Sequence, residues 1–86
     1  MSESFSIRET VLRAMTAILG EEHISNAIQS NAISWSSIQH IHIVMALEDV
    51  FDIELEDDKL SRIKNYVSLV QVVEETINEK EKLRKR

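Results

Sequence analysis

The stretch that decides the fold is SSIQHIHIVMALEDVF, residues 36–51. Its apolar residues recur every three or four positions, which is typical of an α-helix with one buried face. Serine is a common helix N-cap, so the helix is predicted to run from about Ser36 to Phe51. The predicted inner face consists of Ile38, Ile41, Val44, Leu47 and Phe51.

The same helix carries more apolar surface than one inner face needs. Ile43, Met45 and Val50 lie outside the predicted stripe. This excess indicates either deep burial of the whole helix or a surface for a partner.

Before this helix, the sequence predicts one helix and one long loop. The first helix is expected from about Ser6 to Leu19, with Ser6 and Glu9 in a capping-box pattern. Gly20 then provides a stop. Residues 21–36 show no sustained period, so they are expected to form a partly ordered loop that isoleucines pin to the core.

After the helix, residues 52–56 alternate apolar and acidic side chains. An isolated strand would have no pairing partner, so we expect an extended connector whose Ile53 and Leu55 plug the core. A short helix is expected from about Asp57 to Ile63, and a last helix from about Ser68. The last helix is expected to bury Leu69, Val72, Val73 and Ile77, and residues 78–86 are expected to fray as a basic tail.

These elements predict an all-α fold, a single domain of residues 1–86. It is expected to be a small four-helix bundle with three longer helices, one short third helix and a long loop after the first helix. The chain has no proline and one glycine, which argues against hairpins and strands.

The composition excludes several kinds of function. There is no cysteine, which excludes disulfides, thiolate metal sites and a cysteine nucleophile. No apolar run approaches the length that crosses a membrane, and residues 1–4 lack the pattern of a signal peptide. We therefore expect a cytoplasmic protein without stable membrane insertion.

The net charge of −5 is unevenly distributed. The last seven residues hold five basic residues and one acidic residue, so the other 79 carry −9. An acidic domain is expected to repel nucleic acid and to attract basic partner surfaces. The basic end could bind nucleic acid, but we favour the interpretation that it supports a helix C-terminus.

The segment from Ser34 to Leu55 resembles the second-helix region of acyl carrier proteins. In that family an Asp-Ser-Leu motif is followed, seven residues after the serine, by Val-Met-Ala-Leu-Glu and then by acidic residues and Phe-Asp. Residues 44–48 and 51–52 match in register, and counting back seven residues gives Ser37 as the serine. The order of helices and the long first loop also agree with the family.

The resemblance implies that 4'-phosphopantetheine is joined to Ser37, with Ser36 and Ile38 beside it in the cofactor site. A phosphopantetheinyl transferase would attach this arm, whose thiol would hold an acyl group as a thioester. The protein would then be a carrier and not an enzyme, serving fatty acid, polyketide or related lipid biosynthesis. A helix N-terminus suits this attachment, because its amides and dipole stabilise a phosphodiester.

The family's second helix docks on basic patches of acyl-loading, condensing and acyl-transfer enzymes. The resemblance also implies an apolar pocket for the acyl chain, with Met45 and Leu55 near its mouth. A mobile shuttle of this kind is expected to be a monomer. The implied partner-binding residues are Gln39, His42, Met45, Glu48, Asp49, Leu55 and Asp57, with Asp58 extending the acidic patch.

The sequence departs from the family in two places. Ser36 replaces the aspartate that the transferase reads, and Ile38 replaces the leucine. Gln39, His40 and His42 stand where the family often has acidic residues. Fewer acidic residues should weaken docking to standard fatty-acid enzymes, so we hypothesise a specialised carrier for a dedicated pathway.

Two other functions compete with that of a carrier. Ser36 and Ser37 could be ordinary helix caps, and the bundle would then be an unmodified adaptor or regulator that docks through its second helix. A small hydrolase is disfavoured, because His40 and His42 lie on the same helix as Ser37 and no oriented histidine–carboxylate pair is present.

Three features have plain structural explanations. His23, His40 and His42 are interpreted as surface histidines and not metal ligands, because the last two face different directions on one helix. The acidic run over residues 48–58 lacks the glycine and ligand spacing of a calcium loop. Trp35 either plugs the long loop or contacts the arm or a partner, and the plug is favoured.

Overall fold

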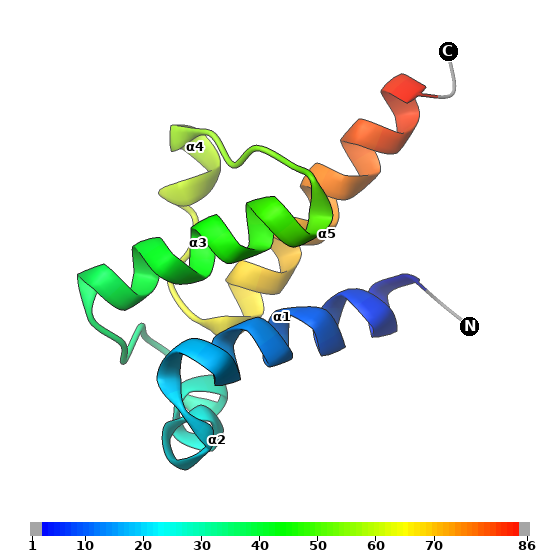
Figure 1. Ribbon diagram of the computed structural model, residues 1–86. Helices are drawn as coiled ribbons and strands as arrows, with labels where there is room; N and C mark the ends of the chain where they lie inside the picture. The colour runs from blue at the N-terminus through cyan, green and yellow to red at the C-terminus, as the bar shows by residue number, and fades with distance from the viewer. Residues whose placement is uncertain (1–2, 85–86) are drawn as a thin grey trace.

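The computed structural model describes residues 3–84 of the chain, with the side chains of residues 7–83. The regular secondary structure of this part is entirely helical. Its helices are α1 (Glu3–Leu19), α2 (Glu21–Gln29), α3 (Ser37–Phe51), α4 (Asp57–Leu60) and α5 (Tyr66–Arg84). The α1 helix packs against α2, α3 and α5, and Figure 1 shows α2 and α4 on opposite sides of it. The all-α prediction is confirmed, but five helices within residues 3–84 replace the predicted four.

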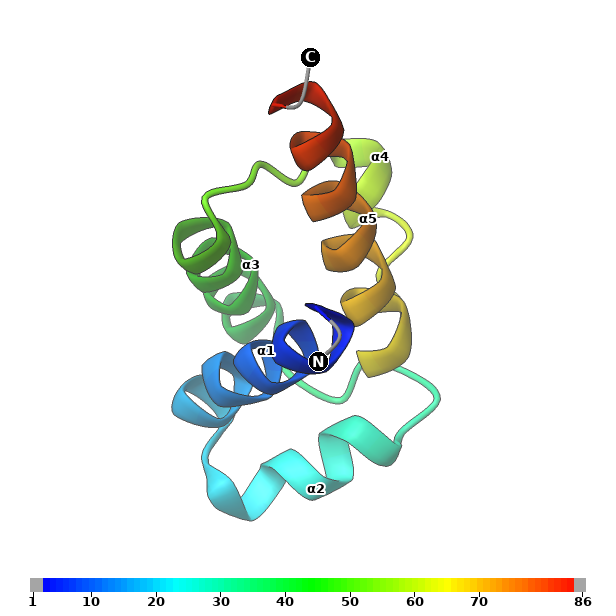
Figure 2. The same ribbon diagram turned by 90° about the vertical axis from the view of Figure 1, so that its right-hand side faces the viewer.

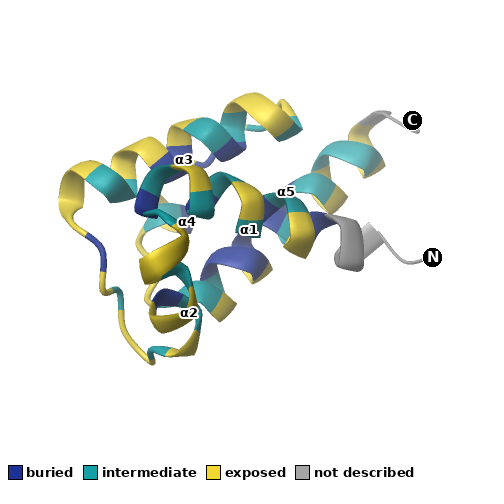
Figure 3. Cartoon of the chain, turned by 60° about the horizontal axis from the view of Figure 1, so that its bottom comes forward, coloured by how far each residue is buried: buried dark blue, intermediate teal, exposed yellow. Residues whose placement is uncertain are grey.

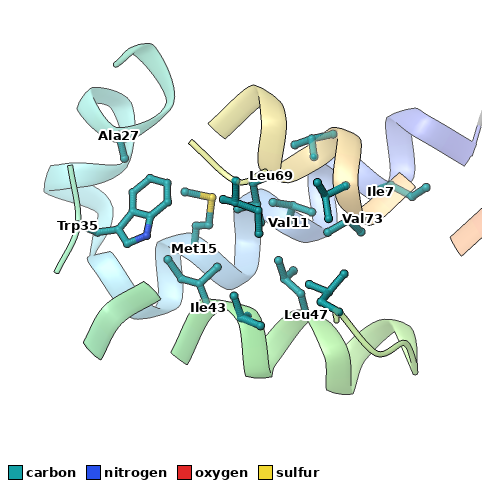
Figure 4. Packing of buried hydrophobic residues seen from close by; sticks show 14 of the residues in the cluster. Ile7, Val11, Met15, Ala27, Trp35, Ile43, Leu47, Leu69 and Val73 are labelled. Atoms are coloured by element: carbon teal, nitrogen blue, oxygen red, sulfur yellow. The ribbon is translucent and has the colours of Figure 1, made fainter. Parts of the chain in front are cut away.

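The core lies where α1, α3 and α5 meet. Val11 and Met15 of α1 face Ile43 and Leu47 of α3, and Leu69 and Val73 come from α5 (Figure 4). Burying each of these side chains contributes about 1.5–3 kcal/mol to stability, so the three helices hold one another in place. The fully buried side chains are Val11, Met15, Ile43, Leu47, Leu69, Val72 and Val73.

The predicted long loop after α1 is mostly the helix α2, and this part of the prediction is wrong. Gly20 separates the two helices at φ 93° and ψ 151°, a conformation that is essentially restricted to glycine. Glu21 and Glu22 follow in the first turn, where negative charge is favourable. Ala27 is buried against the core and holds α2 in place. Only residues 30–36 form a loop.

The central helix is confirmed at both ends. It runs over Ser37–Phe51, and Ser36 is its N-cap. The predicted inner face is partly wrong, because Ile38 and Ile41 are 66% and 55% exposed. The buried residues of α3 are Ile43, Val44 and Leu47.

The connector after α3 agrees with the prediction. Residues 53–56 form no strand, and the Leu55 side chain is buried in the core while Ile53 is half-buried. The next helix, α4, starts at Asp57 as predicted but ends at Leu60. Ile63 is buried in the following loop.

Both terminal helices are longer than predicted. The α1 helix begins at Glu3, so Ser6 lies inside it, and the predicted capping box on Ser6 falls outside the described side chains. The α5 helix begins at Tyr66, because Asn65 Oδ1 accepts the Ser68 amide at 2.8 Å and Ser68 Oγ accepts the Asn65 amide at 3.0 Å.

The predicted fraying of residues 78–86 is replaced by helix as far as Arg84. Two contacts hold this end: Lys59 Nζ lies 2.5 Å from Glu79 Oε1, and Lys80 Nζ lies 2.9 Å from Asp52 Oδ2. Figure 2 shows α5 running past α4. The radius of gyration is 12.6 Å, slightly above the roughly 12 Å of a compact domain of this length, which fits a projecting helix.

Candidate functional site at the start of helix α3

The start of α3 is held by a complete capping box. Ser36 Oγ accepts the Gln39 amide at 3.1 Å, and Gln39 Oε1 accepts the Ser36 amide at 2.9 Å. The Ser36 carbonyl also accepts the His40 amide at 2.8 Å. These bonds fix the backbone on both sides of Ser37, so the direction of its side chain is set by the helix.

Ser37 is the first residue of α3, and its side chain is exposed. Within the described chain, its hydroxyl makes no hydrogen bond, and the amides of Ser37 and Ile38 have no acceptor there. Free amides at the first turn and the positive end of the helix dipole together favour a negatively charged group at this position. An attached phosphodiester would therefore be stabilised beside this hydroxyl.

Trp35, two residues before the exposed Ser37, is buried: 7% of its surface is exposed. Figure 4 shows its indole beside Ala27 and Met15. The indole Nε1 donates to His40 Nδ1 at 2.9 Å, and the two rings stack with centroids 6.2 Å apart. Trp35 is therefore part of the hydrophobic core. Its burial supports the prediction that it packs the loop onto the core, rather than the alternative of contact with the arm or a partner.

The outer side of α3 is exposed and largely apolar. Ile38, Ile41 and Met45 share one face at 55–66% exposure, and His42 and Asp49 lie on the same side. Figure 3 shows exposed residues along this side of α3. These five residues, which we call the outer α3 face, include three predicted partner contacts: His42, Met45 and Asp49.

The other predicted partner contacts have different environments. Asp57 is exposed at the start of α4. Gln39 is half-buried and occupied in the capping box, and the half-buried Glu48 accepts the Leu55 amide at 2.9 Å through Oε2. Leu55 is 4% exposed and packs in the core, so in this conformation it offers almost no surface to a partner.

Two pockets flank the bundle. One, of 260 Å³, lies beside Trp35 and has a partly polar lining that includes His23, Asn26 and Gln39. The other, of 340 Å³, lies between the α3–α4 connector and α5, where Ile53 and Leu83 line it. Met45 and Leu55, the expected mouth of an acyl-chain pocket, line neither of these two pockets.

Sequence reasoning missed two interactions near the site. His40 was interpreted as a surface histidine, but it is half-buried, and burial lowers its pKa below the usual 6.5. The one hint of this in the sequence was that His40 follows Trp35 by five residues, which brings the two rings within reach of each other. Lys59 was given no role, yet its side chain is buried between Thr76 and Glu79.

The described residues contain neither a metal-binding cluster nor a membrane-spanning helix. Residues 3–84 contain no group of three or more histidine or acidic side chains that could hold a metal ion. No helix in this range has the length and apolar character to cross a lipid bilayer. A comparison of the chain with protein-family models, curated proteins and solved structures found no match.

Proposed function

We propose that the protein is an acyl carrier that holds an acyl group as a thioester on a phosphopantetheine arm joined to Ser37. The single observation that carries the proposal is the Ser37 side chain. It is exposed, it makes no hydrogen bond within the described chain, and it stands at the capped N-terminus of α3. Its register with residues 44–48 matches the motif of acyl carrier proteins.

The chemistry of attachment needs little from the protein itself. A transferase would move the arm from coenzyme A to Ser37: the serine oxygen would bond to the phosphorus of the arm, the pyrophosphate P–O bond would break, and 3',5'-ADP and the hydroxyl proton would leave. The free amides of the first turn would then face the phosphodiester, which the helix dipole stabilises by about 0.3–1 kcal/mol when exposed. The chain would act as a substrate and scaffold, with no catalytic residue.

The proposed partners are a phosphopantetheinyl transferase and acyl-loading, condensing or acyl-transfer enzymes with basic docking patches. We place this exchange in the cytoplasm, with the carrier as a monomer. The outer α3 face supplies one acidic residue, Asp49, together with His42 and three apolar side chains. Such a mixed surface suits a dedicated partner better than a generic basic patch, which supports the specialised-carrier hypothesis.

Attachment is tested by incubating the purified protein with coenzyme A and a broad-specificity transferase, and then measuring its intact mass. We expect the parent to gain one phosphopantetheine group and Ser37→Ala to gain none. Ser34→Ala is the matched control: it removes another exposed serine hydroxyl nearby but leaves Ser37 and its helix cap, so it should still be modified. Equal modification of Ser37→Ala and the parent would refute the proposal.

A second candidate is an unmodified adaptor that docks through α3. The observation that favours it is the exposure of Ile38, Ile41 and Met45 on one face, at 66%, 55% and 60%. The same mass measurement separates the candidates, because an adaptor would remain unmodified with every transferase tried.

A further inference from the structure

The hydrogen bond between Trp35 and His40 depends on the charge of His40. The indole N–H is a donor only, and the buried Trp35 uses it on His40 Nδ1 at 2.9 Å. This nitrogen accepts only when the imidazole is neutral and carries its proton on Nε2. A second proton would sit on Nδ1, opposite the indole N–H, and no acceptor would remain.

The bond also bridges the junction between the loop and α3. Trp35 is the last residue before the N-cap, and His40 lies in the first turns of the helix. The loop before it has few other polar anchors among the described residues: Asn65 Nδ2 donates to the Asn31 carbonyl at 3.3 Å, and the Ser30 amide donates to the Asn26 carbonyl at 3.2 Å. Burial of Trp35 is therefore a main attachment of residues 30–36.

We propose that Trp35 and His40 form a proton-operated latch that holds residues 30–36 against the bundle. When His40 Nδ1 takes up one proton, the indole N–H loses its acceptor while still buried. That state is costly, so the indole moves outward and the loop loosens at the start of α3. The proposal goes beyond the carrier function and does not require an arm on Ser37.

The surroundings set the pH at which the latch opens. The indole lies beside Met15 of α1 and Ala27 of α2. The pocket next to it is also lined by Leu19, His23 and Asn26, of which only His23 is ionisable. On α3 the nearest titratable residue in sequence is His42, which is exposed. The pocket beside the indole is lined by no carboxylate that would favour a charged imidazole. Burial lowers the pKa of His40, so the latch is closed at neutral pH and opens in mild acid.

NMR on the whole chain tests the latch directly. The His40 ring and the Trp35 indole N–H are followed from pH 8 to pH 5, together with amide exchange of residues 31–36. We expect both resonances to shift with one midpoint below 6.5. Below that midpoint, protection factors of the loop amides, corrected for intrinsic exchange, should fall about tenfold or more.

Three variants complete the test. His40→Gln keeps an acceptor that cannot take up a proton, so the indole and loop transitions should disappear. His42→Gln is the matched control and should leave both unchanged. In Trp35→Phe no hydrogen bond opposes protonation, so the midpoint of His40 should rise by about 0.4–1 pH unit. An indole resonance that ignores the His40 titration, or an unchanged transition in His40→Gln, would overturn the latch.

Discussion

At the start of α3, three consecutive residues have three different environments. Trp35 is buried, Ser36 is a cap with both its amide and its hydroxyl bonded, and Ser37 is exposed. The Ser36 role was predictable, because a serine before a helical apolar pattern has few other uses. The Trp35–His40 bond was not predictable, since it depends on the indole turning back over the first turn of α3.

Gly20 allows a test of backbone conformation at a single residue. Its φ of 93° lies in a region that other residues rarely adopt, although no atom would meet an added Cβ within 4 Å. Gly20→Ala should therefore lower the free energy of unfolding by about 1–3 kcal/mol through strain alone. Ser30→Ala, at the other end of α2 with an ordinary φ of −74°, should cost much less. Urea unfolding measures both, and equal losses would contradict this explanation.

His40 should make stability depend on pH in a defined direction. Burial lowers its pKa in the folded protein, so the unfolded chain binds the proton more tightly. The free energy of unfolding should fall as the pH drops below about 6.5, and this loss should end below the folded-state pKa. Glu75, whose pKa is lowered by its hydrogen bond to Arg62, acts in a separate window below 4.5.

Urea titrations at several pH values measure this loss. The decline between pH 6.5 and the folded-state midpoint should be smaller in His40→Gln than in the parent. His42→Gln serves as the control for general histidine effects. A decline of the same size in the parent and in His40→Gln would contradict the assignment to His40.

Among the elements, the ends of α3 could be predicted but its orientation could not. Apolar residues surround most of this helix, so spacing alone does not distinguish the face with Ile43 and Leu47 from the face with Ile38 and Ile41. The choice is made by packing against α1 and α5. The α2 helix was missed for a related reason: it contacts the core through the buried Ala27 and the partly buried Ile24, and the polar residues between these two obscure the helical spacing.

The α4 and α5 helices are joined by a buried lysine that composition could not reveal. Lys59 is 8% exposed, and its Nζ donates to Thr76 Oγ1 at 3.2 Å and to Glu79 Oε1 at 2.5 Å. This group also explains why α5 stays helical where fraying was expected.

Truncating this lysine should weaken the junction. Lys59→Ala removes a buried alkyl chain and both bonds, so we expect a loss of about 1–3 kcal/mol and faster amide exchange near residues 76–80. Lys64→Ala, an exposed lysine nearby, should change stability little. If the two variants are equally stable, Lys59 does not hold the end of α5.

For the whole molecule, surface charge is the property on which the proposed choice of partner depends. The chain is acidic apart from its C-terminal end, and exposed carboxylates continue from Asp49 through Glu54 and Glu56 to Asp57 and Asp58. The first turns of α3 interrupt this acidic surface with Gln39 and His42. The lack of acidic residues at these positions was visible in the sequence. Its effect on docking depends on which side chains are exposed, which only the structure shows.

A specialised carrier should be a poor substrate for a housekeeping ketosynthase. We expect the acylated protein to be turned over more slowly than the enzyme's usual carrier. Adding charge in Gln39→Glu with His42→Glu should lower KM by roughly 2- to 30-fold, since exposed charge pairs each contribute about 0.2–1 kcal/mol. Gln71→Glu with Asn78→Asp adds the same charge on α5 and should have little effect. Normal turnover of the parent would contradict the specialised assignment.

The most direct measurement concerns the protein made in its own cells. Mass spectrometry of the peptide that contains Ser37 reports its modification without any chosen transferase or partner. We predict that this peptide carries phosphopantetheine, and that part of it also carries an acyl group that hydroxylamine releases from the thioester. A Ser37 peptide found only in unmodified form, under conditions in which the protein is abundant, would contradict the account.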